Sequence, residues 1–189
     1  SSVIFDWDGT LGETLHLWLA GHRRTLTELG MNVTDKVIID DFFYAYDNEK
    51  AKYPDVNFEK YFNDVQAYVY SHVATVGTYP GALAALERLE EAGVQLALVS
   101  SSNRRLLKES LAGTGLIQFF PHIVSGDDVM RHKPDPEPFE QAIEIAKLDR
   151  SSTIILGDSH ADLRAARAAR LDSCLFLPPE NALFYDFEK

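Results

Sequence analysis

The stretch VIFDWDGT, residues 3–10, decides the fold of this chain. Three apolar residues that suit a buried strand lead into Asp6 and Asp8, and Gly9 follows at once as a turn signal. Successive side chains of an extended segment alternate between faces, so the two carboxylates leave the strand end in the same general direction, on either side of Trp7. Two like charges so close together need a cation between them, or one carboxyl group retains its proton. Either alternative indicates a functional site, with a bound metal or a proton-transferring carboxyl group, at this strand end.

Polar residues also follow two later apolar runs, and a lysine precedes a predicted helix. Residues 94–99 (VQLALV) lead into Ser100, the first of three consecutive serines, and residues 153–156 (TIIL) lead into the acidic segment GDSHAD. Lys133 stands in the segment HKPDP, before a pattern typical of a helix. In open parallel α/β sheets, ligands bind beyond the carboxyl ends of the strands. We therefore expect these segments to converge with Asp6 on one crevice.

The order and placement of these four motifs resemble the haloacid dehalogenase-like hydrolase superfamily, in the phosphatase branch that includes enzymes similar to phosphoglycolate phosphatase and β-phosphoglucomutase. The resemblance covers about residues 3–12 and 79–177. It implies an α/β fold with a Rossmann-like three-layer core around a parallel five-stranded sheet. It also implies a small all-helical cap domain inserted after the first strand.

The periodicity of apolar residues divides the chain in the same way. From residue 79 onward, helical and strand patterns alternate at the spacing of a parallel α/β sheet. The preceding segment shows helical periodicity and many aromatic residues instead. We predict a core domain of residues 1–12 and 79–189 and a helical cap domain of residues 13–78. The predicted strands are 3–5, 94–99, 122–124, 153–156 and 173–177, and the predicted cap helices are 14–29, 35–46 and 58–76.

The resemblance implies a catalytic role for four residues. Asp6 is the expected nucleophile, which forms an aspartyl-phosphate, and Asp8 is the expected general acid and later general base. Ser100 and Lys133 complete the expected catalytic set. The substrate phosphate is expected to bind Ser100, Ser101 and Lys133, although three consecutive serines leave the register open by one residue.

The expected cofactor is Mg²⁺, which prefers oxygen ligands and keeps several of its waters. The resemblance implies a site made by Asp6, by Asp8 through its backbone carbonyl, by Asp158, and by Asp162 through water. The product of such chemistry is inorganic phosphate, so the expected enzyme is a Mg²⁺-dependent phosphoric monoester hydrolase.

Composition limits the partners of this chain. Its formal net charge of −11 argues against nucleic acid and anionic membranes as partners. The resemblance implies a small phosphorylated metabolite as the partner. No stretch approaches the roughly 20 apolar residues that span a bilayer, and the first residues show no signal peptide. The single cysteine, Cys174, fits a reducing, cytoplasmic compartment, and its apolar neighbours predict a buried side chain. The sequence leaves the oligomeric state open.

Two other functions remain open. A β-phosphoglucomutase-like transferase would use the same aspartate pair, but the resemblance places a cap histidine where this chain has Trp18. A catalytically idle binding or regulatory protein is compatible with the fold, but such a chain is expected to lose a charged motif residue, and none is missing. Cap residues that we consider as candidates for substrate contact are His16, His22, Arg23, Arg24, Lys50, Lys52 and Tyr53.

Overall fold

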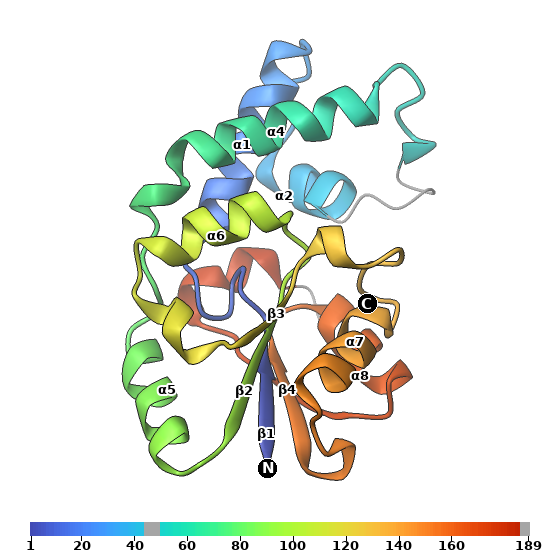
Figure 1. Ribbon diagram of the computed structural model, residues 1–189. Helices are drawn as coiled ribbons and strands as arrows, with labels where there is room; N and C mark the ends of the chain where they lie inside the picture. Colours follow the sequence, from blue (N-terminus) through green and yellow to red (C-terminus); the bar gives the residue numbers. More distant parts are fainter. Residues whose placement is uncertain (44–49, 186–189) are drawn as a thin grey trace.

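A five-stranded parallel sheet forms the centre of the molecule, as the computed structural model shows for residues 1–43 and 50–185 (Figure 1). The strands are β1 (Ser2–Phe5), β2 (Gln95–Val99), β3 (His122–Val124), β4 (Thr153–Gly157) and β5 (Asp172–Leu175). Their order is β3-β2-β1-β4-β5, so the first strand of the chain lies in the middle, paired with β2 and β4. The predicted α/β fold with a parallel five-stranded sheet is confirmed.

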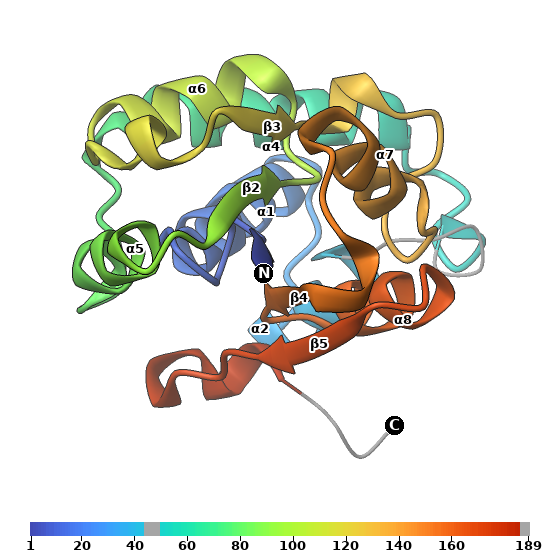
Figure 2. The same cartoon turned by 60° about the horizontal axis from the view of Figure 1, so that its bottom comes forward.

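Helices cover both faces of the sheet. They are α5 (Ala82–Glu91), α6 (Arg104–Ala112), α7 (Glu137–Ala146) and α8 (His160–Ala168). Ile4 of β1 packs in one apolar cluster with residues of α7 and α8, and its neighbour Phe5 packs in a second cluster with residues of α5 and α6. Figure 2 shows α5 and α7 on opposite sides of the strands. Because successive side chains of the central strand point to opposite faces, each face packs against its own pair of helices. The core therefore has three layers, with the sheet between two layers of helices.

The remaining helices lie beyond the carboxyl ends of the strands (Figure 1). They are α1 (Leu15–Glu28), α2 (Asp35–Ile38), the π-helical turn η1 (Ile39–Phe43), α4 (Phe58–His72) and the 3₁₀ turn η2 (Val73–Thr75). Their apolar faces form a third cluster around Leu26, Phe42 and Val65. The predicted helix 35–46 begins at Asp35 as expected and changes to a π-helical turn after Ile38. Its last predicted residues, 44–46, lie outside the described residues.

Two chain connections run side by side between these helices and the sheet. The backbone N–H of Glu13 donates to the carbonyl of Gly77 at 3.1 Å, and that of Tyr79 donates to Leu11 at 3.1 Å. These bonds fix the position at which the helical segment joins the core. The division into a core domain of residues 1–12 and 79–189 and a cap domain of residues 13–78 places its boundaries at these connections and stays a prediction.

Short 3₁₀ turns complete the described chain. They are η3 (Leu116–Phe119), η4 (Gly126–Asp128), η5 (Arg150–Ser152) and η6 (Pro179–Phe184). Among the described residues, no helix is long and apolar enough to cross a membrane.

One sequence expectation is wrong. Cys174 is exposed, whereas its apolar neighbours predicted a buried side chain. It lies in β5, which pairs only with β4 and forms an edge of the sheet. The first three residues of this strand are all exposed, so apolar neighbours further along the chain do not bury the thiol.

Candidate active site

Three buried carboxylates meet at the carboxyl end of the sheet. Asp6 follows β1, Asp158 follows β4, and Asp162 lies in the first turn of α8. Each of the three offers a carboxylate oxygen, and these atoms lie within 4.8 Å of one another. The backbone N–H of Asp6 donates to the carbonyl of Leu156 at 2.8 Å, which extends the pairing of β1 with β4 to the site. The predicted convergence of the first and last motifs is therefore present in the fold.

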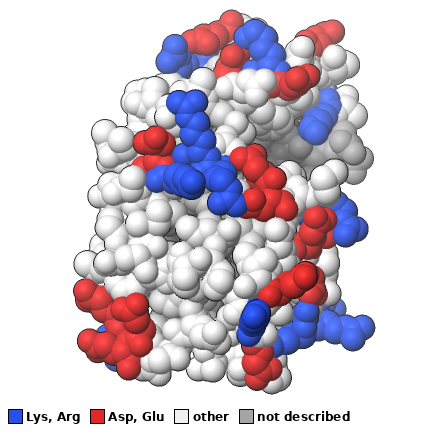
Figure 3. Space-filling model, viewed as in Figure 1, with Lys and Arg blue, Asp and Glu red and all other residues white. Residues whose placement is uncertain are grey.

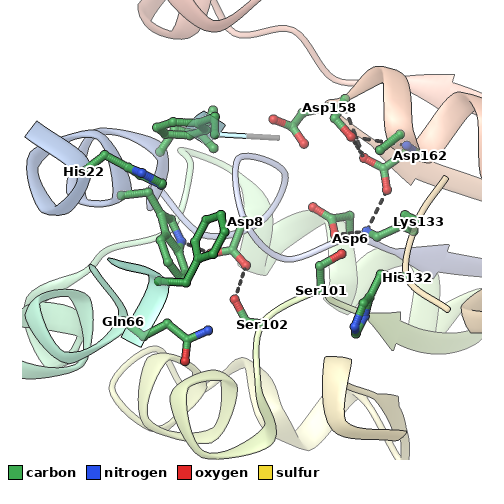
Figure 4. A pocket seen from close by; sticks show the side chains of 16 residues that line it. Asp6, Asp8, His22, Gln66, Ser101, Ser102, His132, Lys133, Asp158 and Asp162 are labelled. Atoms are coloured by element: carbon green, nitrogen blue, oxygen red, sulfur yellow. Dashed lines mark hydrogen bonds and ion pairs between the residues drawn. The ribbon is translucent and has the colours of Figure 1, made fainter. Parts of the chain in front are cut away.

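Lys133 lies between two of these carboxylates (Figure 4). Its Nζ donates to Oδ1 of Asp6 at 2.5 Å and to Oδ1 of Asp162 at 2.7 Å. The three side chains are 5%, 6% and 3% exposed, so the ion pairs are shielded from water. Burial alone would lower the pKa of Lys133, but the charges of Asp162 and Asp6 outweigh it and hold the pKa above its ordinary value. The ammonium group is thus fixed in its charged form.

One ammonium group does not balance the negative charge of the cluster. Burial raises the pKa of Asp6 to about 8, with Asp162 and Asp8 adding to the effect and Lys133 opposing it. The pKa of Asp158 is also raised, first by burial and then by the charges of Asp6 and Asp162. Carboxylates that repel one another in this way favour either a shared proton or an added cation. Hard oxygen donors of this kind suit Mg²⁺.

Asp162 has a structural role beside its place in the cluster. Its Oδ2 accepts hydrogen bonds from the hydroxyl of Ser159 at 2.6 Å and from the backbone N–H of Ser159 at 3.1 Å. In return the backbone N–H of Asp162 donates to Ser159 Oγ at 3.2 Å, which completes a capping box at the start of α8. The capping box thus fixes Oδ2 of Asp162, and Lys133 binds Oδ1.

Gly9 allows the first and last motifs to approach. Its φ is +80°, in the left-handed region that favours glycine, and a Cβ here would lie 2.2 Å from Oδ2 of Asp158. Any side chain at position 9 would therefore displace the Asp158 carboxylate.

Asp8 lies apart from the cluster and accepts four hydrogen bonds. Thr14 Oγ1 and Trp18 Nε1 donate to its Oδ1 at 2.7 and 2.9 Å. Ser100 and Ser102 donate through their hydroxyls to its Oδ2 at 3.2 and 2.9 Å. Both oxygens of the carboxylate are thus held, one by residues at the start of the helical segment and the other by residues after β2.

The three serines after β2 have different positions. Ser101 and Ser102 line the cavity of the site, and Ser100 does not. Ser100 and Ser102 are both buried and both bond Asp8, and Ser100 Oγ accepts a hydrogen bond from the backbone N–H of Ser102 at 3.0 Å. The role of Ser100 in phosphate binding stays a prediction. Sequence reasoning missed Ser102 and Thr14 as partners of Asp8. The run of three serines is the sequence signal that could have found Ser102, because the sequence alone does not say which of the three hydroxyls faces the site.

A cavity of about 390 Å³ lies over this cluster. From the core it is lined by Asp6, Asp8, Ser101, Ser102, His132, Lys133, Asp158, Ser159, Ala161 and Asp162. Six described residues of the helical segment also line it, and we call them the roof: Leu15, Trp18, His22, Phe43, Phe62 and Gln66. Figure 4 shows His22 and Gln66 across the cavity from the acidic cluster.

Only one of the seven cap candidates belongs to the roof, namely His22. Arg23 pairs with Asp35 and Arg24 with Glu28, both at 2.8 Å on the surface. The side chains of Lys52 and Tyr53 bond Asp41, and the His16 ring contacts the carbonyl of Glu180. Lys50 is not among the lining residues.

An open parallel sheet with buried carboxylates and a lysine beyond its carboxyl ends defines a class of α/β enzymes that bind their ligand at the strand ends. A family model makes the assignment specific. The model described as haloacid dehalogenase-like hydrolase matches residues 3–176, so the chain belongs to this family of enzymes, as the sequence motifs predicted.

Relatives in this family have phosphatase names. Pyrophosphatase PpaX of Oceanobacillus iheyensis is 28% identical over 179 residues, which cover 91% of this chain and 81% of the relative. Phosphoglycolate phosphatase of Neisseria meningitidis is 29% identical, over 89% of this chain and 76% of the relative. The crystal structure of a protein described as a putative phosphoglycolate phosphatase of Lactobacillus plantarum matches with a TM-score of 0.83 at 24% identity, covering 92% of this chain and 84% of that one.

Proposed function

We propose that this chain is a Mg²⁺-dependent phosphatase that hydrolyses the phosphomonoester of a small metabolite through an aspartyl-phosphate on Asp6. The observation that carries the proposal is the buried group of Asp6, Asp158 and Asp162 with Lys133 bound between two of them. The phosphatase names of the relatives support it. We place the reaction in a reducing, cytoplasmic setting, which suits the free and exposed thiol of Cys174.

Asp6 is the proposed nucleophile because it lies on the cavity floor and each of its carboxylate oxygens accepts a hydrogen bond. Lys133 holds Oδ1, and the hydroxyl of Thr10 donates to Oδ2 at 3.4 Å. A carboxylate oxygen of Asp6 attacks phosphorus, and the bond from phosphorus to the alcohol oxygen breaks. A covalent intermediate of this kind divides the hydrolysis into two easier displacements.

Asp8 is the proposed general acid and base. In the first displacement it gives a proton to the departing alcohol oxygen, and in the second it takes a proton from the water that attacks phosphorus. That attack releases inorganic phosphate and restores the Asp6 carboxylate. The serine and threonine hydroxyls around Asp8 can reverse their hydrogen bonds as its charge changes, whereas Trp18 Nε1 can only donate.

The residues present fit a magnesium ion. Asp6 and Asp158 would bind it through carboxylate oxygens and Asp8 through its backbone carbonyl, with Asp162 acting through water. Burial and, after it, the charges of neighbouring carboxylates raise the pKa values of Asp6 and Asp158, which favours an added cation. A bound Mg²⁺ would reduce the repulsion between these carboxylates and the phosphate.

Phosphate binding falls to residues on the core side of the cavity. Lys133 would balance charge on the phosphoryl oxygens, with help from the hydroxyls of Ser101 and, as the sequence predicts, Ser100. Residues 13–78 would act as a cap that covers the cavity and supplies its roof. The leaving alcohol would then lie between the acidic cluster and the roof.

Phosphate release from a panel of phosphomonoesters, with and without Mg²⁺, tests this function. We expect turnover that requires the metal, stops on addition of a chelator, and is lost in Asp6→Asn. Asp172→Asn, a matched change at an exposed residue of the edge strand β5, should retain the activity. Release by Asp6→Asn at the wild-type rate would overturn the proposal.

A further inference from the structure

Among the residues that the structure describes, the roof of the cavity contains no lysine or arginine. Five of its residues are apolar or aromatic side chains, if the ring of His22 is counted with them, and the sixth is the neutral amide Gln66. Residues 44–49 read YAYDNE, so this neighbouring stretch of sequence has no basic residue either. Any part of a substrate that faces the roof meets rings, methyl groups and one amide.

The basic residues of the helical segment are paired on its surface instead. Arg23 bonds Asp35 at 2.8 Å, and Lys60 bonds Asp64 at 2.5 Å. Lys52 bonds Asp41 at 2.6 Å. Figure 3 shows basic and acidic side chains next to one another at this end of the molecule. None of these cations lines the cavity.

The imidazole of His22 is neutral. It is 3% exposed, its Nδ1 lies 2.5 Å from Tyr61 Oη, and it stacks on Phe43 with ring centroids 5.0 Å apart. Burial lowers its pKa to about 4. The other histidine of the cavity, His132, is exposed and lies on the core side (Figure 4).

Gln66 is the one side-chain amide among the described residues of the roof. Its Oε1 accepts from Nδ2 of Asn103 at 3.0 Å, which fixes the orientation of the amide. Figure 4 shows the amide nitrogen on the side of Ser102 and the cavity. The amide therefore offers an N–H donor to a neutral oxygen of the substrate.

We propose that the roof selects phosphomonoesters whose alcohol is uncharged, presents an apolar or aromatic face to Trp18 and Phe62, and carries a hydrogen-bond acceptor toward Gln66. A carboxylate or second phosphate on the alcohol would be buried without a cation, which is costly. On the floor, Lys133 is already bound to two carboxylates. Phosphoglycolate and pyrophosphate, after which relatives are named, both carry a second anionic group. This inference rests on the proposed function.

Two pairs of esters that differ in one charge test the selectivity. One pair is 2-hydroxyethyl phosphate and phosphoglycolate, and the other is benzyl phosphate and 4-carboxybenzyl phosphate. Within each pair, we expect kcat/KM with Mg²⁺ to be at least about tenfold higher for the neutral member, because a buried charge without a partner is strongly disfavoured. The benzyl ester should exceed the hydroxyethyl ester, since it fills the aromatic roof.

A charge placed on the roof should reverse the preference. Gln66→Lys is expected to raise kcat/KM for the carboxylate esters relative to their neutral partners by about tenfold or more. Asn63→Lys is the matched control: it makes the same change on α4 at an exposed residue outside the cavity, and should leave the wild-type ratio intact.

The outcomes separate the two proposals. Equal or higher kcat/KM for the charged members in the wild type would overturn the selectivity and leave the phosphatase function standing. This comparison needs no variant, so it holds even where Gln66→Lys does not fold. Absence of turnover on every ester by the folded wild-type protein with Mg²⁺ present would overturn the function and the selectivity together.

Discussion

The indole Nε1 of Trp18 donates a hydrogen bond to Oδ1 of Asp8 at 2.9 Å. Trp18 belongs to α1 of the helical segment, and Asp8 follows the central strand of the sheet. Thr14, the residue before α1, bonds the same oxygen. The orientation of the proposed acid and base is therefore linked to the position of the helical segment.

Trp18→Phe should lower kcat by about tenfold with little change in KM, because it removes one hydrogen bond and keeps an aromatic wall. Three other hydrogen bonds continue to hold Asp8 in this variant. Steady-state kinetics on the best ester of the panel gives both constants. A higher KM at unchanged kcat would mean that Trp18 acts only as a wall of the cavity.

Lys133→Met should lower kcat by about 10²–10³-fold, since it removes a buried positive charge next to the reacting phosphate. It should also reduce the free energy of unfolding of the metal-free protein by about 3 kcal/mol, because Asp6 and Asp162 lose their shared partner. Urea unfolding with and without Mg²⁺ measures the stability. The matched change Lys60→Met, at an exposed pair on α4, should cost less than about 1 kcal/mol. Equal losses in the two variants would contradict the role given to the buried ammonium.

Binding of Mg²⁺ at pH 7 should release about one proton or more per site. Burial and the neighbouring carboxylates raise the pKa values of Asp6, to about 8, and of Asp158, so the cluster shares a proton at pH 7 that a metal displaces. Titration calorimetry in two buffers of different ionisation enthalpy measures the release, and Asp6→Asn should release less. Heats that do not depend on the buffer would show that no proton is released and would contradict the shared proton of the metal-free cluster.

Acid should destabilise the protein through His22 of α1. Burial lowers the pKa of His22 from 6.5 to about 4, so in this interval the unfolded chain binds a proton that the folded chain does not. The free energy of unfolding therefore falls as the pH falls from 6.5 to 4, and this residue contributes a loss of about 2 kcal/mol between pH 7 and pH 5. Urea unfolding at both values should show a smaller loss in His22→Gln than in His122→Gln, the matched replacement on β3. The same loss in both variants would show that another group carries the acid sensitivity.

The core of the fold was predictable because its signals are local. The alternation of apolar runs and turn residues predicted the five strands and placed Asp6 and Asp158 at the ends of two of them, which the fold then makes neighbours. Cys174 shows the limit of the same reasoning: neighbouring residues do not reveal that β5 is an edge strand.

The contacts around Asp8 and the roof were less predictable, because they depend on how α1 and α4 pack over the strand ends. The charge of Arg23 and Lys52 made them candidates for substrate contact, yet each has an acidic partner on the surface of the helical segment. Trp18 and Gln66 reach the cavity from helix faces whose direction is set by packing between elements distant in sequence.

The most direct test of the mechanism is to trap the covalent intermediate. In Asp8→Asn the base of the second displacement is missing, so an ester with a good leaving group, such as p-nitrophenyl phosphate, should phosphorylate the enzyme faster than water removes the phosphate. After an acid quench, peptide mapping by mass spectrometry should find phosphate on Asp6, labile to hydroxylamine, with a burst of about one p-nitrophenol per active site. A burst with phosphate on another residue, or steady turnover with Asp6 unmodified throughout, would contradict the aspartyl-phosphate mechanism.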